Sequence, residues 1–207
     1  MTITVPWEDH LRSLGIPPRL IAYTAAPIPG NGEFESVRTA AGARMPWPLV
    51  VYLFGDNGNG KTHSATWLFS VWHARQFVKW DSDKGKYQPR AKWTTERAVT
   101  EALKAYGDDN FDMRRAMLLY TEPDILLIDD VFTEKTSDTD ITNITDLLET
   151  RRDSDRITII TSNKGPLTIS NDYSVRLAER LIDNALVLEF TGPSHRMTQY
   201  FKQSMEQ

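Results

Sequence analysis

The stretch that decides the fold is LFGDNGNGKTHSATW, residues 53–67. Its first two residues end the apolar run LVVYLF at 49–54, and its glycines follow directly after that run. It contains three glycines, Gly55, Gly58 and Gly60, in a segment of only six residues. Glycine loses more backbone freedom on folding than any other residue, so it is costly in an ordered chain. Three glycines in one turn therefore indicate backbone conformations, or a close approach to another group, that a side chain would prevent.

Residues 55–62 fit the pattern G-x-x-x-x-G-K-[ST] of a phosphate-binding P-loop, between an apolar strand and a helix-like stretch. Successive backbone N–H groups of such a loop form a cradle for phosphate, and the following helix adds its positive end. We expect Lys61 to reach the β- and γ-phosphates of ATP and the Thr62 hydroxyl to ligate Mg²⁺. The predicted ATP-binding residues here are Gly55, Asp56, Asn57, Gly58, Asn59, Gly60, Lys61, Thr62 and, on the helix near the nucleotide, His63.

Two further apolar runs end in polar residues. DILLIDD, residues 124–130, ends in Asp129 and Asp130, and ITIITSN, residues 157–163, ends in Asn163. Ligands of open α/β sheets collect at the carboxyl ends of the strands. We expect Asp129 to be the Mg²⁺ partner, directly or through water, and Asp130 to polarise the attacking water. If the two strands are neighbours, Asn163 faces the γ-phosphate and orients that water.

Short apolar runs alternate with helical periods after residue 49, which predicts an α/β fold with a parallel sheet and helices on both faces. The five predicted strands are Leu49–Phe54, Ala91–Trp93, Asp124–Asp129, Ile157–Thr161 and Ala185–Phe190. Residues 1–44 are interpreted as a short N-terminal arm and linker, and residues 45–207 as the ATPase domain. Trp7, Leu11 and Leu14 have helical spacing, so 6–14 is a candidate partner-docking helix, unless this face packs on the protein's own core.

The composition of the 207 residues is ordinary for a globular protein, with 40% hydrophobic and 25% charged residues. The formal net charge of −4 means that any nucleic-acid contact must be a local patch. The absence of cysteine excludes disulfides, thiol catalysis and zinc–thiolate sites. No signal peptide is recognised at the N-terminus and no apolar run is long enough to span a bilayer, so we expect a cytoplasmic protein without membrane contact.

Together these residues resemble the AAA+ ATPases, and more closely the DnaC/DnaI helicase loaders and the IstB transposition ATPases. LGIPPRL at 14–20 is similar to the segment before their ATPase core, LLIDD at 126–130 to their Walker B motif, and TIITSN at 158–163 to their sensor 1. RLAERL at 176–181 is similar to their box VII, and EFTGPSHR at 189–196 to their closing sensor 2 motif. The chain departs from them in Asp130, where many members have Glu, and in its short N-terminal extension.

The resemblance implies a P-loop NTPase with an AAA+ core, a five-stranded parallel sheet and a reduced or absent lid. It implies self-association into a ring or spiral, in which Arg180, or else Arg176, is the arginine finger that completes a neighbour's site. It also implies that Asn163 is sensor 1 and that Arg196 contacts ATP as sensor 2. An isolated chain should therefore hydrolyse ATP slowly.

Loader relatives bind single-stranded DNA, and one stretch here interleaves basic and aromatic residues as such binding requires. The predicted DNA contacts are Lys84, Lys86, Tyr87, Arg90, Lys92 and Trp93, although the same pattern also fits a solvated loop. The leading hypothesis is an ATP-dependent loader of a DnaB-type replicative hexameric helicase onto single-stranded DNA. The alternatives are an IstB-like transposition helper and a non-hydrolysing ATP-binding adaptor. A small-molecule kinase is disfavoured, because we find no sign of an acceptor pocket or a lid.

Overall fold

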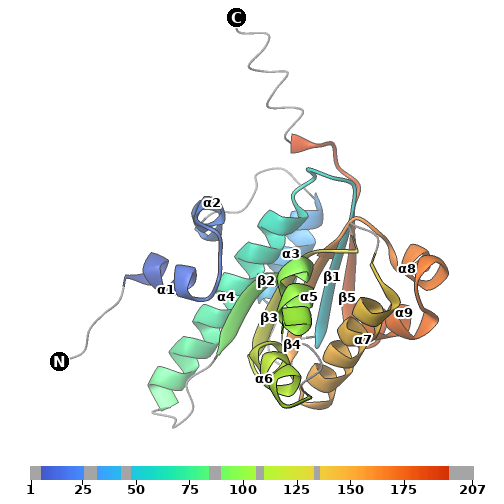
Figure 1. The fold of residues 1–207 in the computed structure, drawn as a ribbon. Coiled ribbons are helices and arrows are strands. Elements are labelled where there is room, and N and C mark those ends of the chain that lie inside the picture. The colour runs from blue at the N-terminus through green and yellow to red at the C-terminus, as the bar shows by residue number, and fades with distance from the viewer. Residues whose placement is uncertain are drawn as a thin grey trace, which may run out of the picture.

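The computed structural model describes residues 6–25, 32–42, 48–83, 90–105, 110–132 and 136–195. Five strands form one sheet in the order β2-β3-β4-β1-β5, and all neighbouring strands are parallel (Figure 1). The strands are β1 (Val50–Gly55), β2 (Ala91–Thr95), β3 (Ile125–Val131), β4 (Ile157–Ser162) and β5 (Ala185–Phe190). The prediction of a five-stranded parallel sheet is confirmed, and β2 and β3 each run two residues beyond their predicted ends.

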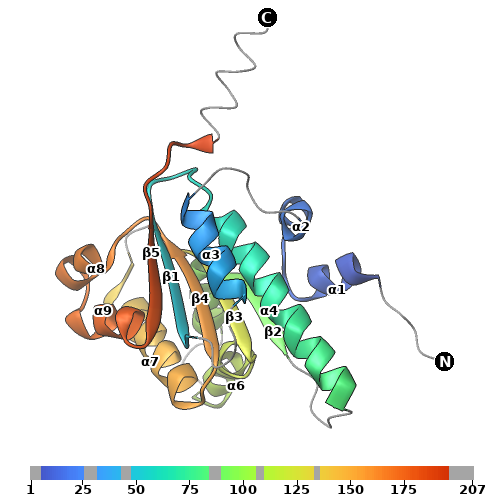
Figure 2. The ribbon, with the colours of Figure 1, turned by 180° about the vertical axis from the view of Figure 1, so that it is seen from behind.

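Helices cover both faces of the sheet, as Figures 1 and 2 show from opposite sides. One face carries α3 (Gly32–Gly42) and α4 (Lys61–Asp83), and the other carries α5 (Glu96–Ala105), α6 (Asn110–Thr121), α7 (Asp138–Asp153) and α9 (Val175–Ile182), with α8 (Pro166–Asp172) packed on α9. Strand residues alternate between the two cores, so that Val51 and Leu53 join one and Val50 and Tyr52 the other. No helix in the described ranges is both long and apolar enough to cross a membrane.

The N-terminal segment consists of α1 (Trp7–Ser13), α2 (Pro18–Ile21) and the short 3₁₀ helix η1 (Ala22–Thr24). Its apolar side chains Leu11, Ile16, Leu20 and Ile21 are buried in the same core as the inner face of α4. Of the two alternatives left open for this face, packing on the protein's own core is what the structure shows for Leu11, which is fully buried, and for Leu14, which packs against this core, whereas Trp7 is 43% exposed. The core also spans the predicted boundary at residue 44, since it includes residues on both sides of it.

This segment is tied to the edge of the sheet at β2. The backbone N–H of Trp93 donates a 2.7 Å hydrogen bond to the carbonyl of Leu14. Gly15 follows with a φ of +99°, and a Cβ there would overlap the Trp93 carbonyl oxygen. Glycine is therefore required at this position for the chain to turn so close to the strand. The contact covers the outer edge of β2 and carries the chain towards the carboxyl ends of the strands.

Arg151 of α7 is a buried cation at the amino ends of β3 and β4. Its side chain is fully buried and donates 2.8 Å hydrogen bonds to the carbonyls of Tyr120 and Pro123 and to the Thr158 hydroxyl. Burial lowers the pKa of Arg151 to about 9. These bonds satisfy carbonyls at the end of α6 and before β3 that no secondary structure would pair. They hold α7 against β3 and β4, the two strands whose ends carry Asp129 and Asn163.

Candidate nucleotide-binding site

The glycines of the loop between β1 and α4 adopt conformations that other residues rarely reach. Gly55, Gly58 and Gly60 have φ values of +135°, +84° and +101°. A Cβ on Gly55 would overlap the carbonyl oxygen of Phe190, and one on Gly58 would overlap the Ser194 side chain. The loop thus needs these glycines both for its turn and for its contact with the segment after β5. This arrangement agrees with the sequence prediction of a loop that approaches other groups closely.

Lys61 begins α4 and folds its side chain back into the loop. Only 5% of the residue is exposed. Its Nζ donates to the carbonyl oxygens of Gly55 at 2.8 Å and Asp56 at 2.6 Å, and to the Asn59 side-chain oxygen at 3.2 Å. Asn59 is itself buried and donates to the Phe190 carbonyl. An anion that enters the loop therefore meets a positioned ammonium group beside the N-terminus of a long helix.

Thr62 and Asp129, the predicted metal pair, are brought together by α4 and β3. The Thr62 hydroxyl donates a 2.8 Å hydrogen bond to Asp129 Oδ1, and the Thr161 hydroxyl of β4 donates a 2.7 Å bond to the same oxygen. Asp129 is 4% exposed. Burial raises the pKa of Asp129, while the hydrogen bonds from Thr161 and Thr62 act in the opposite direction. A hydroxyl and a carboxylate are oxygen ligands of the kind that Mg²⁺ prefers, and phosphate and water usually complete its shell.

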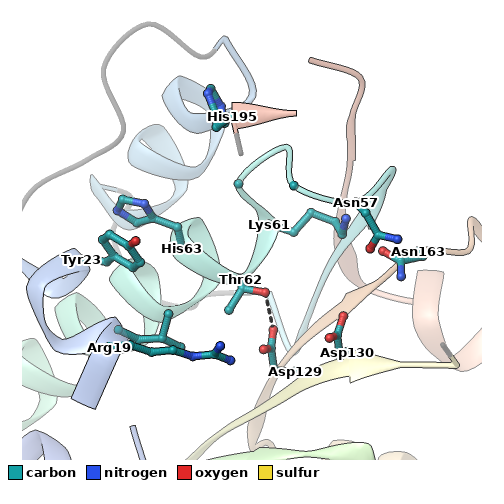
Figure 3. A pocket seen from close by; sticks show the side chains of 13 residues that line it. Arg19, Tyr23, Asn57, Lys61, Thr62, His63, Asp129, Asp130, Asn163 and His195 are labelled. Carbon is teal, nitrogen blue, oxygen red and sulfur yellow. Dashed lines mark hydrogen bonds between the residues drawn. The ribbon is translucent and has the colours of Figure 1, made fainter. Parts of the chain in front are cut away.

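These groups line one cavity of about 450 Å³ (Figure 3). Its lining residues are Arg19, Leu20, Tyr23, Asn57, Gly58, Gly60, Lys61, Thr62, His63, Asp129, Asp130, Asn163 and His195. Asp130 is exposed, with a φ of +60°, and its backbone N–H donates a 2.9 Å bond to the Thr161 hydroxyl. The side-chain oxygen of Asn163 is buried without a hydrogen-bond partner among the described residues. Such an orphaned polar atom indicates a ligand or water that belongs there.

The donor set fits a magnesium–nucleotide complex. The glycine cradle and Lys61 suit phosphate, Thr62 and Asp129 suit the metal, and the unpaired Asn163 oxygen suits a water molecule. The cavity volume lies within the range of about 300–1,000 Å³ that ligand sites usually have. All but Gly55, Asp56 and Asn59 of the predicted residues 55–63 line the cavity. Arg196 lies outside the described residues.

Sequence reasoning missed the contribution of the N-terminal segment. Arg19, Leu20 and Tyr23 line the cavity, and the Tyr23 ring stacks on His63 with ring centroids 4.1 Å apart. It also missed Thr161, whose hydroxyl joins both acids of β3. A sequence signal for Thr161 existed, because it is a polar residue in the otherwise apolar strand ITIIT. The motif LGIPPRL contains Arg19 and Leu20, but it did not show that they face the loop, because about forty residues separate them from it.

Arg176 and Arg180, the two candidate fingers, lie on α9 and do not line the cavity. Both donate through Nε to Glu149 Oε1 of α7, at 2.9 and 2.8 Å. Hydrogen bonds from Arg176 and then Arg180 lower the pKa of Glu149 to about 2. The two arginines therefore form one cluster with Glu149, away from the cavity of their own chain.

The predicted DNA contacts divide into three groups. Trp93 is 6% exposed and donates from Nε1 to the Thr66 hydroxyl, so its prediction as a base-stacking residue is wrong. Arg90 is exposed but forms a 2.6 Å ion pair with Glu122, and Lys92 lies 5.3 Å from the centroid of the Tyr120 ring. Lys84, Lys86 and Tyr87 lie outside the described residues. Within the described part of the chain, only Arg90 and Lys92 thus remain as candidate DNA contacts.

No family model and no curated protein matches the sequence. Solved structures share the fold, which is the P-loop AAA+ fold. A DnaC helicase loader superposes with a TM-score of 0.67 at 16% identity, covering 84% of this chain and 100% of that one. A DnaI structure gives 0.65 at 18%, covering 90% and 100%. The replication initiator DnaA bound to AMPPCP and single-stranded DNA gives 0.65 at 16%, covering 89% of this chain, which spans only 54% of the DnaA chain.

Proposed function

We propose that this protein is an ATP-dependent loader of a replicative hexameric helicase onto single-stranded DNA, acting as an oligomeric ATP switch. One observation carries the proposal: the Lys61 loop, the Thr62–Asp129 pair and Asn163 converge on a single cavity. Two supports are the similarity of this fold to the DnaC and DnaI structures over the full length of those chains, and a structure of the DnaA neighbour that contains AMPPCP.

In the proposed reaction, water attacks the γ-phosphorus of ATP and the bond to the β–γ bridging oxygen breaks. ADP and inorganic phosphate form, and the proton lost by the water passes to solvent. The loop N–H groups and Lys61 bind the phosphates, and Thr62 with Asp129 holds Mg²⁺. The metal, when bound, neutralises charge on the phosphate oxygens. Asp130 accepts a hydrogen bond from the attacking water, and the free side-chain oxygen of Asn163 accepts a second one. These contacts stabilise the transition state by placing the water and compensating charge.

Assembly enters the proposal through the arginine cluster on α9. Because Arg176 and Arg180 do not line the cavity of their own chain, either one acts on a nucleotide only in a neighbouring copy. An arginine finger supplied in this way raises phosphoryl-transfer rates by roughly 10³–10⁵-fold. ATP then fixes the contact between subunits and hydrolysis loosens it, as expected of a nucleotide switch. Single-stranded DNA would contact the basic stretch from Lys84 to Lys92. We expect the protein to act in the cytoplasm.

The test combines turnover with partner capture. ATP hydrolysis is measured for the chain alone, with single-stranded DNA, and with DNA and the host's replicative helicase, and Asp130→Asn serves as the matched inactive variant. The proposal expects slow basal turnover, stimulation by DNA and helicase, and recovery of the helicase with the tagged protein from its native host. Recovery of a transposase instead would favour the transposition helper. ATP binding without turnover under every condition would favour a non-hydrolysing adaptor.

A further inference from the structure

Arg19 is a cation at the acidic end of the cavity, and the proposed hydrolysis gives it no role. It lies on α2, is exposed, and lines the cavity together with Asp129 and Asp130. Figure 3 shows its guanidinium directed towards Asp129 and Thr62 rather than out of the site. Among the described residues no hydrogen bond or ion pair of the Arg19 side chain is found, and its charge acts on Asp129. Its five donors therefore remain available to a ligand.

The position of Arg19 is fixed by its neighbours in sequence. Leu20 and Ile21 are each 6% exposed and anchor α2 in the core, and the Leu20 N–H closes the turn on the Pro17 carbonyl at 2.8 Å. Pro18 at the start of α2 restricts the backbone further. The charge of Arg19 also lowers the pKa of Asp129, although burial, the larger cause, raises it. The guanidinium is thus held by a packed element within electrostatic reach of the metal pair.

We propose that Arg19 contacts the terminal phosphate of ATP bound in its own chain. This inference rests on the proposed nucleotide site. Thr62 and Asp129 are the residues that would hold Mg²⁺, which would neutralise phosphate charge there, so we expect the terminal phosphate beside this pair. If Mg²⁺ occupied the Asp129 carboxylate, the acceptors left near Arg19 would be the Asp130 carboxylate, which the proposed reaction uses for the attacking water, and the phosphate oxygens. The planar guanidinium fork matches a phosphate group with two parallel hydrogen bonds.

The contact gives the N-terminal segment a means of sensing the γ-phosphate. Arg19 shares its helix with two core residues, and the same segment is bonded to β2 through Leu14. ATP would tie this segment to the carboxyl edge of the sheet, whereas ADP would leave Arg19 without its acceptor. Arg19 therefore discriminates between ATP and ADP. Lys61 discriminates less well, because its ammonium group also contacts the β-phosphate, which both nucleotides carry.

Calorimetric titration with Mg²⁺–AMPPCP and with Mg²⁺–ADP tests this role on the full chain. Arg19→Gln should weaken AMPPCP binding about tenfold or more, the usual effect of losing a hydrogen bond to a charged group, and change ADP binding less than about twofold. Arg19→Lys, which keeps the charge but not the fork, should lie between. Arg12→Gln changes an exposed arginine of α1 outside the cavity and should leave both affinities and the unfolding midpoint unchanged.

The outcomes separate this inference from the proposed function. Equal losses for AMPPCP and ADP, or no loss for either, would overturn the role of Arg19 while leaving the site intact. If the unchanged protein binds neither nucleotide, or if Lys61→Ala binds both normally, the nucleotide site itself is refuted and the role of Arg19 falls with it. A lower unfolding midpoint of Arg19→Gln that matches its loss of affinity would show that the residue is only structural.

Discussion

The hydroxyl of Thr161 contacts the carboxylate of Asp129 and the backbone of Asp130, and replacing it with the isosteric Val tests how the site sets the ionisation of Asp129. It donates 2.7 Å to Asp129 Oδ1 and accepts 2.9 Å from the Asp130 backbone N–H. Thr161 is fully buried, so no water can take its place without moving the strand. Thr161→Val keeps the shape and removes both hydrogen bonds, whereas Thr161→Ser keeps the hydroxyl and is the matched control.

The size of the effect follows from the charge on Asp129. Hydrogen bonds to charged groups contribute about 1.5–3 kcal/mol, and each pKa unit corresponds to about 1.4 kcal/mol. The pKa of Asp129 is already raised by burial, and Thr161 is the largest influence that lowers it. Losing this donor should raise the pKa by a further one to two units, roughly. Because only the ionised carboxylate holds Mg²⁺ well, Mg²⁺-dependent nucleotide binding should require a correspondingly higher pH.

The assay is nucleotide affinity with and without Mg²⁺, measured for both variants from the lowest pH at which each stays folded up to neutral pH. The unchanged protein and Thr161→Ser should share one midpoint, and Thr161→Val should have a midpoint about one to two units higher. The pH dependence of folding stability has the opposite sign to that of Mg²⁺-dependent binding. A raised folded pKa means that the contribution of Asp129 to stability is complete below its unfolded pKa and is lost as pH rises through the folded pKa. An unchanged midpoint in Thr161→Val would refute the reasoning, because Thr161 would then not set the ionisation of Asp129.

The remaining predictions concern binding, turnover and stability. Lys61→Ala should abolish calorimetric ATP binding without changing the far-ultraviolet circular dichroism of the fold. Arg180→Ala should leave ATP binding intact and lower turnover of the DNA-stimulated assembly by about 10³-fold or more, and the same result for Arg176→Ala alone would reverse the assignment of the finger. Arg151→Leu should lower the urea unfolding free energy by about 3–5 kcal/mol, because several buried acceptors lose their donor; a loss below about 1 kcal/mol would contradict this account.

The fold and the centre of the site could be predicted because their signals are local in sequence. A buried strand, a glycine turn and a helix follow one another without interruption from 49 to 67, and each imposes its own residue pattern. Asp129 and Asn163 could be placed because parallel strands share one carboxyl edge.

The errors arose where contacts are distant in sequence. Trp93 lies in a basic and aromatic stretch that resembles a DNA-binding surface, but Leu14 covers the edge of β2 and Thr66 accepts the Trp93 indole N–H. The helical face of Leu11 could be assigned neither to docking nor to the core, because nothing in the sequence showed which core would bury it. Periodicity identifies an apolar face but not its partner, and partners distant in sequence leave no local pattern.

The choice between the two arginines of α9 follows from how Glu149 engages them. Arg176 uses both Nε and a terminal nitrogen on the two oxygens of Glu149, so its fork is occupied. Arg180 donates only through Nε, and within the described ranges its terminal nitrogens have no partner. A guanidinium held by Nε is oriented while its outer edge stays free for phosphate. Hydrogen bonds from Arg176 and Arg180 lower the pKa of Glu149 to about 2, so its carboxylate is ionised near neutral pH and accepts from Arg180. On this geometry we propose Arg180 rather than Arg176 as the finger, with Glu149 orienting its guanidinium.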